Sequence, residues 1–308
     1  MIKMEVLILC SCVVTLVLFP YQTTQGALEG IRLCGCTVIP GVFPFFFLTK
    51  LLGERLPRRW VQSGRGGILM SLVGGYPTGV ATTVSMYKRG RISKERAQSL
   101  IPLCNNSGPG FFLGVLGTVV FRSKELGLWL YLIHGATALL IFGLFSREDG
   151  ETGHGRAIEK QSFACTFQKS LVESCETMVR VCGMVILFSV LRELVSPLLT
   201  GGLRKYWGLV ELSSSVPVTD SGDFILWAIL MGWGGLCVHL QSMSIWQEAG
   251  LQVRGYFAIK ALHGVLSGLC AGAMVYGGWK MMATLMVPGW IFAYFRKNWG
   301  RKKQHLAL

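Results

Sequence analysis

The stretch ILMSLVGGYPTGVATTVSMY, residues 68–87, is apolar at both ends and is interrupted in the middle by GGYPTG, residues 74–79. Proline lacks an N–H group and glycine permits non-helical angles, so this segment predicts a broken helix. The loops on its two sides are both strongly basic, and a single membrane crossing would place one of them outside. A re-entrant hairpin that enters and leaves at the cytoplasmic face, with GGYPTG at its tip near mid-membrane, satisfies both observations. The basic residues are Arg55, Arg58, Arg59 and Arg65 before the stretch and Lys88, Arg89, Arg91, Lys94 and Arg96 after it.

The composition of the whole chain indicates a membrane protein. Of its 308 residues 51% are hydrophobic and 15% are charged, against about 25% charged in a soluble domain. A bilayer core about 30 Å thick needs about 20 apolar residues per helix, so the chain is long enough for eight to ten segments. We therefore predict an all-α polytopic membrane protein and exclude a soluble enzyme. The net charge of +14 lies in short loops between apolar runs, which favours topology rather than nucleic-acid binding as its explanation.

The remaining apolar runs complete a predicted topology. Residues 4–20 are interpreted as an uncleaved first span, with a signal peptide ending near Gly26-Ala27 as the alternative. The run at 203–219 is weakly apolar and follows Gly201-Gly202, so it is interpreted as a second hairpin. About eight crossing helices and two re-entrant hairpins then place most basic residues, and both termini, in the cytoplasm. The other predicted helices span 28–53, 97–121 (broken), 125–146, 172–196, 224–246, 256–277 and 281–295.

This order predicts an inverted repeat, because each half contains a helix, a hairpin and a further helix in opposite orientations. The polar segment 146–161 is interpreted as a solvated hinge between the halves. The predicted domains are an N-terminal transmembrane helix (1–27), a first repeat (28–121), a connecting helix and cytoplasmic loop (122–162), a second, inverted repeat (163–246), and C-terminal helices with a basic cytoplasmic tail (247–308).

Four polar or broken clusters stand where apolar helix is expected to continue. Unwound segments expose backbone N–H and C=O groups, which form small-molecule sites between half-helices. We predict that these clusters bind a substrate, and that Glu211 and Ser213 take part in coupling to a proton or sodium ion. The predicted substrate-binding residues are Gly75, Tyr76, Pro77, Thr78, Gly79, Asn105, Asn106, Ser107, Gly234, Gly235 and Gln241.

Each of these assignments has a structural alternative. The two asparagines suit a kink in which their side chains satisfy the freed backbone, and Glu211 suits a headgroup position near Arg204 and Lys205. His239 is more often a hydrogen-bonded packing residue than a proton carrier, and only one of His239 and Gln241 is expected to line a cavity. Arg192 is interpreted as a paired or snorkelling residue, with a substrate carboxylate clamp as the alternative.

The sequence contains no catalytic or metal-binding motif. HExxH, G-x-S-x-G and P-loop patterns are absent, and the ten cysteines show no metal-ligand spacing. We therefore expect neither an enzyme nor a bound cofactor.

Four stretches carry a resemblance to a known family. They are VIPGVFPFFFLTKLL (38–52), GGYPTGVATT (74–83), ISKERAQSLIPLCNNSGPGFFLGVLG (92–117) and MGWGGLCVHLQS (231–242). With these stretches the chain resembles sporulation integral membrane proteins of the YlbJ (SpoVV) type, which contain a nucleoside-recognition or Gate domain. The resemblance implies a bacterial cell membrane, including the forespore membrane, and movement of dipicolinic acid.

The repeat arrangement is also similar to that of concentrative nucleoside transporters, in which both hairpins carry a carboxylate. Glu211 matches the second of these, whereas GGYPTG supplies none at the first. The expected function is a secondary transporter, or transport subunit, for a small anionic metabolite. The alternatives are a nucleoside or nucleobase transporter and a non-transporting Gate-domain scaffold in spore-envelope assembly. The expected partners are the substrate and the lipid bilayer, with homo-oligomer formation left open and no nucleic acid.

Overall fold

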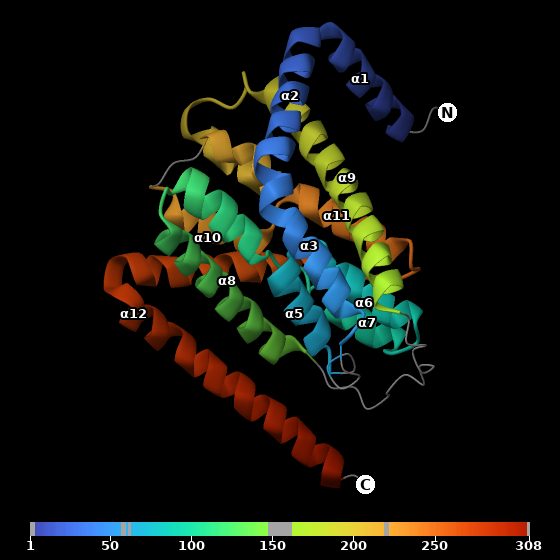
Figure 1. The fold of residues 1–308 in the computed structure, drawn as a ribbon. Coiled ribbons are helices and arrows are strands. Elements are labelled where there is room, and N and C mark those ends of the chain that lie inside the picture. Colours follow the sequence, from blue (N-terminus) through green and yellow to red (C-terminus); the bar gives the residue numbers. More distant parts are fainter. Residues whose placement is uncertain (1–3, 57–59, 61–62, 147–161, 219–221, 307–308) are drawn as a thin grey trace.

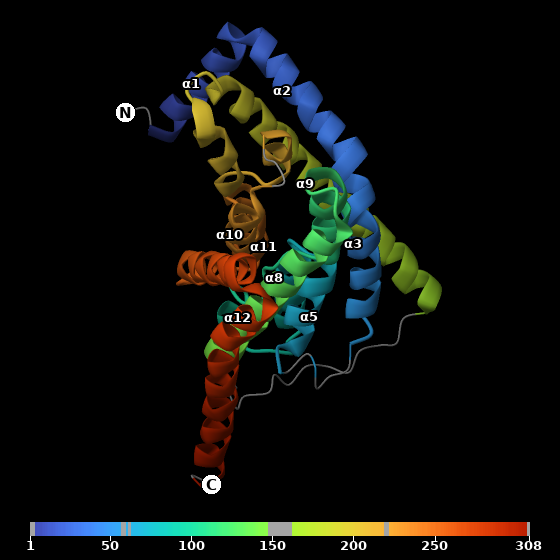
Figure 2. The same cartoon turned by 90° about the vertical axis from the view of Figure 1, so that its left-hand side faces the viewer.

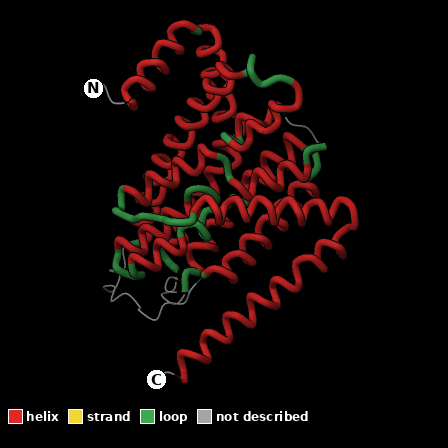
Figure 3. Tube along the Cα trace, turned by 180° about the vertical axis from the view of Figure 1, so that it is seen from behind, coloured by secondary structure: helices red, strands yellow, loops and turns green. Residues whose placement is uncertain are grey.

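The computed structural model describes residues 4–56, 60, 63–146, 162–218 and 222–306, and over these residues it contains helices and loops but no strand (Figure 3). Four helical stretches are long and apolar enough to cross a membrane: 20–53, 124–145, 224–247 and 256–294. The protein is therefore an all-α membrane protein. The helices in chain order are α1 Met4–Leu18, α2 Pro20–Leu33, η1 Cys34–Val38, α3 Ile39–Gly53, α5 Arg65–Gly74, α6 Thr78–Lys88, α7 Lys94–Leu100, η2 Gly110–Val120, α8 Lys124–Phe145, α9 Phe163–Val195, η3 Gly201–Leu209, η4 Ser213–Val218, α10 Phe224–Trp233, α11 Leu236–Gln247 and α12 Tyr256–Leu306.

Helix α2, the π-helical turn η1 and α3 form one long helical stretch, which lies beside α9 (Figure 1). Two glycines of α2 make this packing possible. A Cβ added at Gly26 would lie 2.7 Å from Cα of Val190, and one at Gly30 would lie 2.7 Å from Cα of Ile186. Small residues four positions apart let helix backbones approach closely inside a membrane.

A second group of helices consists of α8, α10 and α12. α10 and α8 both pack against α12, around buried residues that include Phe112, Trp227 and Met231. α12 breaks at Gly278, where φ is +67°, and its second limb returns along α8, with Gly289 close to Leu140. Figure 2 shows the two limbs of α12 running in different directions.

The interruptions predicted at glycine and proline are present. α5 ends at Gly74 and α6 begins at Thr78, and the two helices pack against each other. α10 and α11 are separated by Gly234 and Gly235, whose φ values of +98° and +77° suit only glycine. Between α7 and η2 the chain forms turns and irregular backbone from Ile101 to Gly108, a stretch that contains the asparagine pair. The position of the α5–α6 hairpin within a membrane stays a prediction.

Three segments differ from their predicted form. Helix α2 begins at Pro20, so the connection expected before residue 28 is helical; proline fits the first turn, where its missing N–H has no partner to lose. α9 begins at Phe163, nine residues earlier than the predicted 172. In the region of the second predicted hairpin, residues 201–209 and 213–218 form two short 3-10 helices, η3 and η4, because their glycines and serines favour turns over α-helix. The predicted hinge at 146–161 lies, apart from Ser146, outside the described residues.

Helix α1 has no buried residue and, beyond its junction with α2, points away from the other helices in Figure 1. In Figures 1 and 2 the N-terminus and the C-terminus lie at opposite ends of the molecule. The predicted topology places both termini in the cytoplasm, and that placement stays a prediction.

An ion pair joins the end of α3 to the end of α6. Arg89 donates to the two carboxylate oxygens of Glu54 at 2.7 and 2.6 Å. These hydrogen bonds from the guanidinium lower the pKa of the Glu54 carboxyl, which lies just beyond the membrane-spanning part of α3. A bidentate Arg–carboxylate pair fixes geometry as well as charge. Arg89, which follows the α5–α6 hairpin, is thus linked to α3, the helix before the hairpin.

Candidate functional site

The interrupted segments meet around one partly open cavity, whose empty space, including the part that opens outward, is about 620 Å³. Its wall includes Gly75 and Tyr76 from the α5–α6 turn and Ser107 from the loop before η2. It also includes Glu211 from the η3–η4 turn and Gln241 from α11. Four segments that are far apart in the sequence therefore contribute to a single site.

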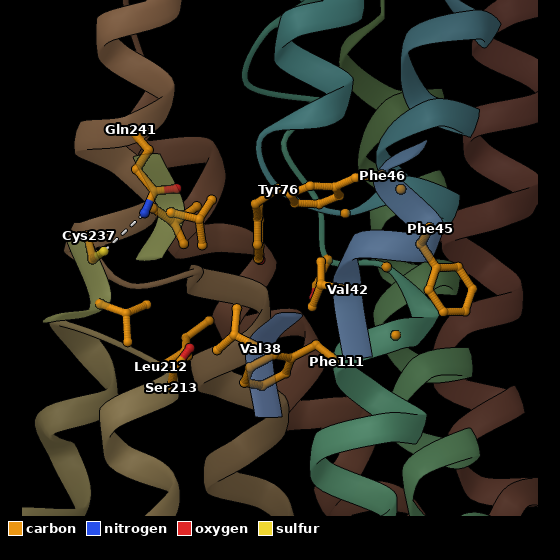
Figure 4. A pocket seen from close by; sticks show the side chains of 18 of the residues that line it. Val38, Val42, Phe45, Phe46, Tyr76, Phe111, Leu212, Ser213, Cys237 and Gln241 are labelled. Carbon is orange, nitrogen blue, oxygen red and sulfur yellow. Dashed lines mark hydrogen bonds between the residues drawn. The ribbon is translucent and has the colours of Figure 1, made fainter. Parts of the chain in front are cut away.

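Helices α3 and α9 contribute an apolar part of the remaining wall, with Val42, Phe45 and Phe46 from α3 and Val181 and Val185 from α9. Figure 4 shows Phe46, Val42 and Phe111 on one side of the cavity, and Leu212 and Cys237 on the other. Tyr76 reaches between the two sides, where its hydroxyl donates to the carbonyl of Met231 at 2.7 Å. Apolar and aromatic walls with a few placed polar groups are typical of small-molecule sites.

Glu211 supplies the carboxylate of the cavity wall. Its side chain is buried, and its two oxygens accept hydrogen bonds from the backbone N–H groups of Ser213 at 2.8 Å and Ser214 at 2.5 Å. Lys205, which the headgroup alternative places near Glu211, pairs with Asp223 at 3.0 Å. The carboxylate therefore caps its own turn while facing the cavity.

Two helix N-termini lie at the cavity. η2 begins at Gly110, and Gly108, Gly110 and Phe111 all contribute to the wall. α11 begins at Leu236, and the next two residues, Cys237 and Val238, line the same space. Helix N-termini present partial positive charge, which favours negatively charged groups.

Of the predicted site residues, Gly75, Tyr76, Ser107, Glu211, Ser213 and Gln241 line the cavity. The structure does not bring Pro77, Thr78, Gly79, Asn105, Asn106, Gly234 or Gly235 to its wall. Gln241 faces the cavity and donates to Cys237 Sγ at 3.2 Å, whereas His239 does not line it. Of these two α11 residues, only Gln241 is in the cavity wall.

The side chains of Asn105 and Asn106 form hydrogen bonds that fix the loop before η2, and they do not line the cavity. Asn106 donates from Nδ2 to Ser71 Oγ at 3.0 Å and to the carbonyl of Leu103 at 2.9 Å. Asn105 donates to the hydroxyl of Tyr256. Both asparagines are buried. The hydrogen bond from Asn106 to Leu103 fits the alternative in which a side chain satisfies the unwound backbone, whereas Asn105 contacts the side chain of Tyr256.

The glycines outside the cavity wall allow close packing. A Cβ at Gly79 would lie 2.0 Å from the carbonyl oxygen of Cys104, and one at Gly235 would lie 3.3 Å from two carbonyl oxygens. A Cβ at Gly234 would lie 3.1 Å from the hydroxyl of Tyr76. These residues bring the backbone segments of the site together.

A second hollow, of about 540 Å³, lies on the other side of the α5–α6 turn. Thr78, Arg89 and Arg91 line it together with Lys50 of α3 and Glu173 of α9. Lys50 donates to the backbone carbonyl of Glu173 at 2.6 Å and to Thr177 Oγ1 at 2.9 Å. The GGYPTG turn therefore separates the apolar cavity from a charged hollow.

Arg192 is a paired residue. Its guanidinium donates to the carboxylate of Glu29 on α2 and to the carbonyl of Ser214. The pairing alternative thus describes its contacts, and it does not line the cavity.

Sequence reasoning missed a buried polar cluster behind the cavity. Lys260, His263 and Tyr256 of α12 meet His134 of α8 and His239 of α11, and all five side chains are buried. A lysine inside the apolar run 256–277 is a visible signal, because ionisable residues within membrane segments are rare. The aromatic cavity residues that sequence reasoning missed, Phe45, Phe46 and Phe111, carry no such signal.

The fold and the site define the class as an all-α integral membrane protein in which interrupted helices enclose a small-molecule-sized cavity. The chain is similar to the sporulation integral membrane protein YlbJ of Bacillus subtilis (strain 168), with 24% identity over 335 aligned positions that cover 88% of this chain and 81% of that protein. This similarity supports the resemblance that the four motifs indicate. No family model and no solved structure matches the chain.

Proposed function

We propose that this chain is a secondary transporter, or a transport subunit, for a small aromatic carboxylate, with dipicolinic acid during sporulation as the leading candidate. The observation that carries the proposal is the convergence of four interrupted segments on one cavity. Transporters bind their substrates between such segments near the bilayer midplane. The name of the similar Bacillus protein supports a role in sporulation, and the resemblance to the YlbJ type supplies the candidate cargo.

The shape and charge of the cavity suit an aromatic anion. Phe46, Phe111 and Tyr76 offer ring faces and edges, and aromatic pairs favour stacked or edge-to-face contact. The N-termini of η2 and α11 offer partial positive charge for a carboxylate. The negative charge of Glu211 is offset by the two N–H groups that it accepts, so it opposes an anion less than a bare carboxylate would.

The path proposed for the cargo passes the GGYPTG turn. The cavity lies on one side of this turn and the charged hollow with Lys50 and Arg91 on the other. Closely packed glycines form the barrier, since a Cβ at Gly74 would lie 2.8 Å from Thr49 of α3. Movement of the hairpin relative to α3 would connect the two spaces, which is how alternating access operates in repeat-built transporters.

The topology that goes with this function is the predicted one. We propose about eight crossing helices with hairpins at 66–87 and 203–219, in two repeats of opposite orientation at 28–121 and 163–246. Both termini then lie in the cytoplasm, and the membrane is the bacterial cell membrane or the forespore membrane derived from it. The Gate-domain assignment and homo-oligomer formation are parts of the same proposal.

The test is uptake of radiolabelled dipicolinate by proteoliposomes that contain only this protein. We expect uptake above that of empty liposomes, with uridine a poor competitor. Uptake without any other protein would exclude the scaffold alternative, and preference for uridine would favour the nucleoside alternative. No uptake of either compound would contradict the transport proposal.

A matched pair of variants ties uptake to the cavity. Val181 lines the cavity, whereas Val179 on the same helix is 72% exposed. Val181→Trp is expected to fill the space and reduce uptake about tenfold or more, since a lost cargo contact of about 1.4 kcal/mol changes binding tenfold. Val179→Trp is expected to keep the uptake of the unmodified protein. Equal uptake by the two variants would place the cargo elsewhere.

A further inference from the structure

Lys260 lies at the centre of the buried polar cluster, behind the wall of the cavity. Its ammonium nitrogen contacts the backbone carbonyl of Asn105 at 2.6 Å and Nδ1 of His263 at 3.3 Å. It also lies 5.9 Å from the centre of the Tyr76 ring, whose residue lines the cavity. The side chain of Lys260 is fully buried.

The cluster is rich in bases and poor in acids. Among the described residues no carboxylate lies within 4.0 Å of the Lys260 nitrogen. The rings of His134 and His263 lie beside each other, with centres 4.5 Å apart. Three nitrogen bases packed together without a counter-ion repel one another when each carries a proton, so protons must be shared among them.

Hydrogen bonding assigns a tautomer to each of these two histidines. His263 accepts from Lys260 at Nδ1, so its hydrogen is on Nε2, which donates to the carbonyl of His134 and to Thr137 Oγ1. His134 accepts at Nε2 from the backbone N–H of Ser107 at 3.1 Å, so its hydrogen is on Nδ1. Both rings are therefore neutral, and the one nitrogen lone pair of each ring already accepts a hydrogen bond.

A further proton can enter His134 only at Nε2, where it must displace the N–H of Ser107. Ser107 lines the cavity, and its loop is held at a second point by Lys260 through the carbonyl of Asn105. The protonation state of the cluster is thus linked to the position of one cavity wall. A conformational equilibrium responds to a ligand in proportion to its different affinity for the two states, and here the ligand is a proton.

We propose that Lys260, His263 and His134 form a proton-binding site whose loading releases the loop 101–109 from His134 and so moves the cavity wall at Ser107. The proton comes from bulk water and occupies the Nε2 lone pair, so no other reactant is needed. As a coupling site for transport this inference rests on the proposed function, whereas proton binding and loop release do not depend on it.

The groups that face the cluster come from every element packed against it. α12 contributes Tyr256 besides Lys260 and His263, α11 contributes His239, and the α5–α6 turn contributes Tyr76. α8 contributes His134 and, one turn away, Tyr131, whose hydroxyl donates to the carbonyl of Leu72 at 3.1 Å. The hydroxyls of Tyr76 and Tyr256 stay neutral over the tested range of pH 5 to 8, and they take part in the cluster through hydrogen bonds alone.

The test is hydrogen exchange of the amides of residues 101–109, measured by mass spectrometry on the full chain in detergent micelles from pH 8 to pH 5. Rates are corrected for the intrinsic effect of pH on exchange. The released state can bind a proton at Nε2 of His134, whereas the held state cannot do so without losing the hydrogen bond from the Ser107 N–H. Protection of the loop is therefore expected to fall as the pH is lowered from 8 to 5, by at most about tenfold per pH unit.

Two variants separate the proton site from general loosening. His134→Gln keeps an oxygen acceptor for the Ser107 N–H but cannot titrate, so its loop is expected to stay protected at pH 5. Tyr131→Phe removes a hydrogen bond from the same helix without removing a base, and its pH dependence is expected to match that of the unmodified protein. A constant protection in the unmodified protein, or an unchanged fall in His134→Gln, would overturn the inference. Loss of loop protection together with absent dipicolinate uptake would leave this site standing and refute the transport proposal.

Discussion

Gly79→Ala is expected to destabilise the protein by about 3 kcal/mol or more, the largest effect that we expect from a single added methyl group. The new Cβ would lie 2.0 Å from the carbonyl oxygen of Cys104 and 2.3 Å from Cβ of Ser71. Neither neighbour can move away freely, because one is backbone and the other sits on the packed helix α5. The crossing of the GGYPTG turn and the loop 101–109 must therefore open, and the cavity wall that the two segments share opens with it.

Gly183→Ala is the matched control for this change. Gly183 lies inside helix α9, and an added Cβ there meets no atom within 4 Å. Alanine is the better helix former by up to about 1 kcal/mol, so this variant is expected to be as stable as the unmodified protein or more stable. Thermal unfolding in detergent measures both. Equal midpoints for the two variants would show that the crossing is looser than the structure describes.

Glu211→Ala is expected to lower the free energy of unfolding by about 3 kcal/mol, because it leaves the buried N–H groups of Ser213 and Ser214 without their acceptor. Glu211→Gln keeps one oxygen acceptor and is expected to lose about half as much. Alanine at the exposed Glu248 is expected to change nothing and serves as the control. Stability of Glu211→Ala equal to that of the Glu248→Ala control would contradict the capping role.

The same variants bear on the predicted coupling role of Glu211. If this carboxylate carried the coupling ion, folded Glu211→Gln would transport without dependence on a pH or sodium gradient. If the cluster around Lys260 binds the coupling proton, Glu211→Gln keeps its dependence on the pH gradient, whereas His134→Gln loses it. Uptake driven by an imposed gradient separates the two assignments, because it measures coupling rather than folding.

The helix breaks were predictable because their causes are local. Proline at 77 and the glycine pairs at 74–75 and 234–235 exclude continuous helix wherever the chain runs. The helical form of residues 20–27 was not predicted, because polar residues there suggest a loop unless the packing of Gly26 on α9 is known. In the same way, the 3-10 form of 201–209 and 213–218, within the predicted second hairpin, follows from turn-forming residues that outweigh a weak hydrophobic pattern.

The candidate site was only partly predictable for a related reason. Polar residues in apolar runs predict a site, yet a polar side chain beside a helix break either lines the cavity, as Ser107 does, or bonds to the unwound backbone, as Asn106 does. The aromatic wall is invisible in sequence, since Phe46 has the same composition signal as a lipid-facing phenylalanine. Lys260 was recognisable as a rare intramembrane charge, but its partners come from α8 and from the loop 101–109, and only the fold brings these together.

The most direct test of the site is whether the cargo protects a native cysteine from chemical modification. Cys237 lines the cavity, while Cys104 is equally buried and lies outside its wall. Two variants that each retain one of these cysteines, with the other nine replaced by serine or alanine, are treated with a small methanethiosulfonate reagent with and without dipicolinate. The account predicts that dipicolinate slows modification of Cys237 and leaves that of Cys104 unchanged. Modification of Cys237 at the same rate in the presence of saturating dipicolinate would contradict the claim that the interrupted helices enclose the cargo site.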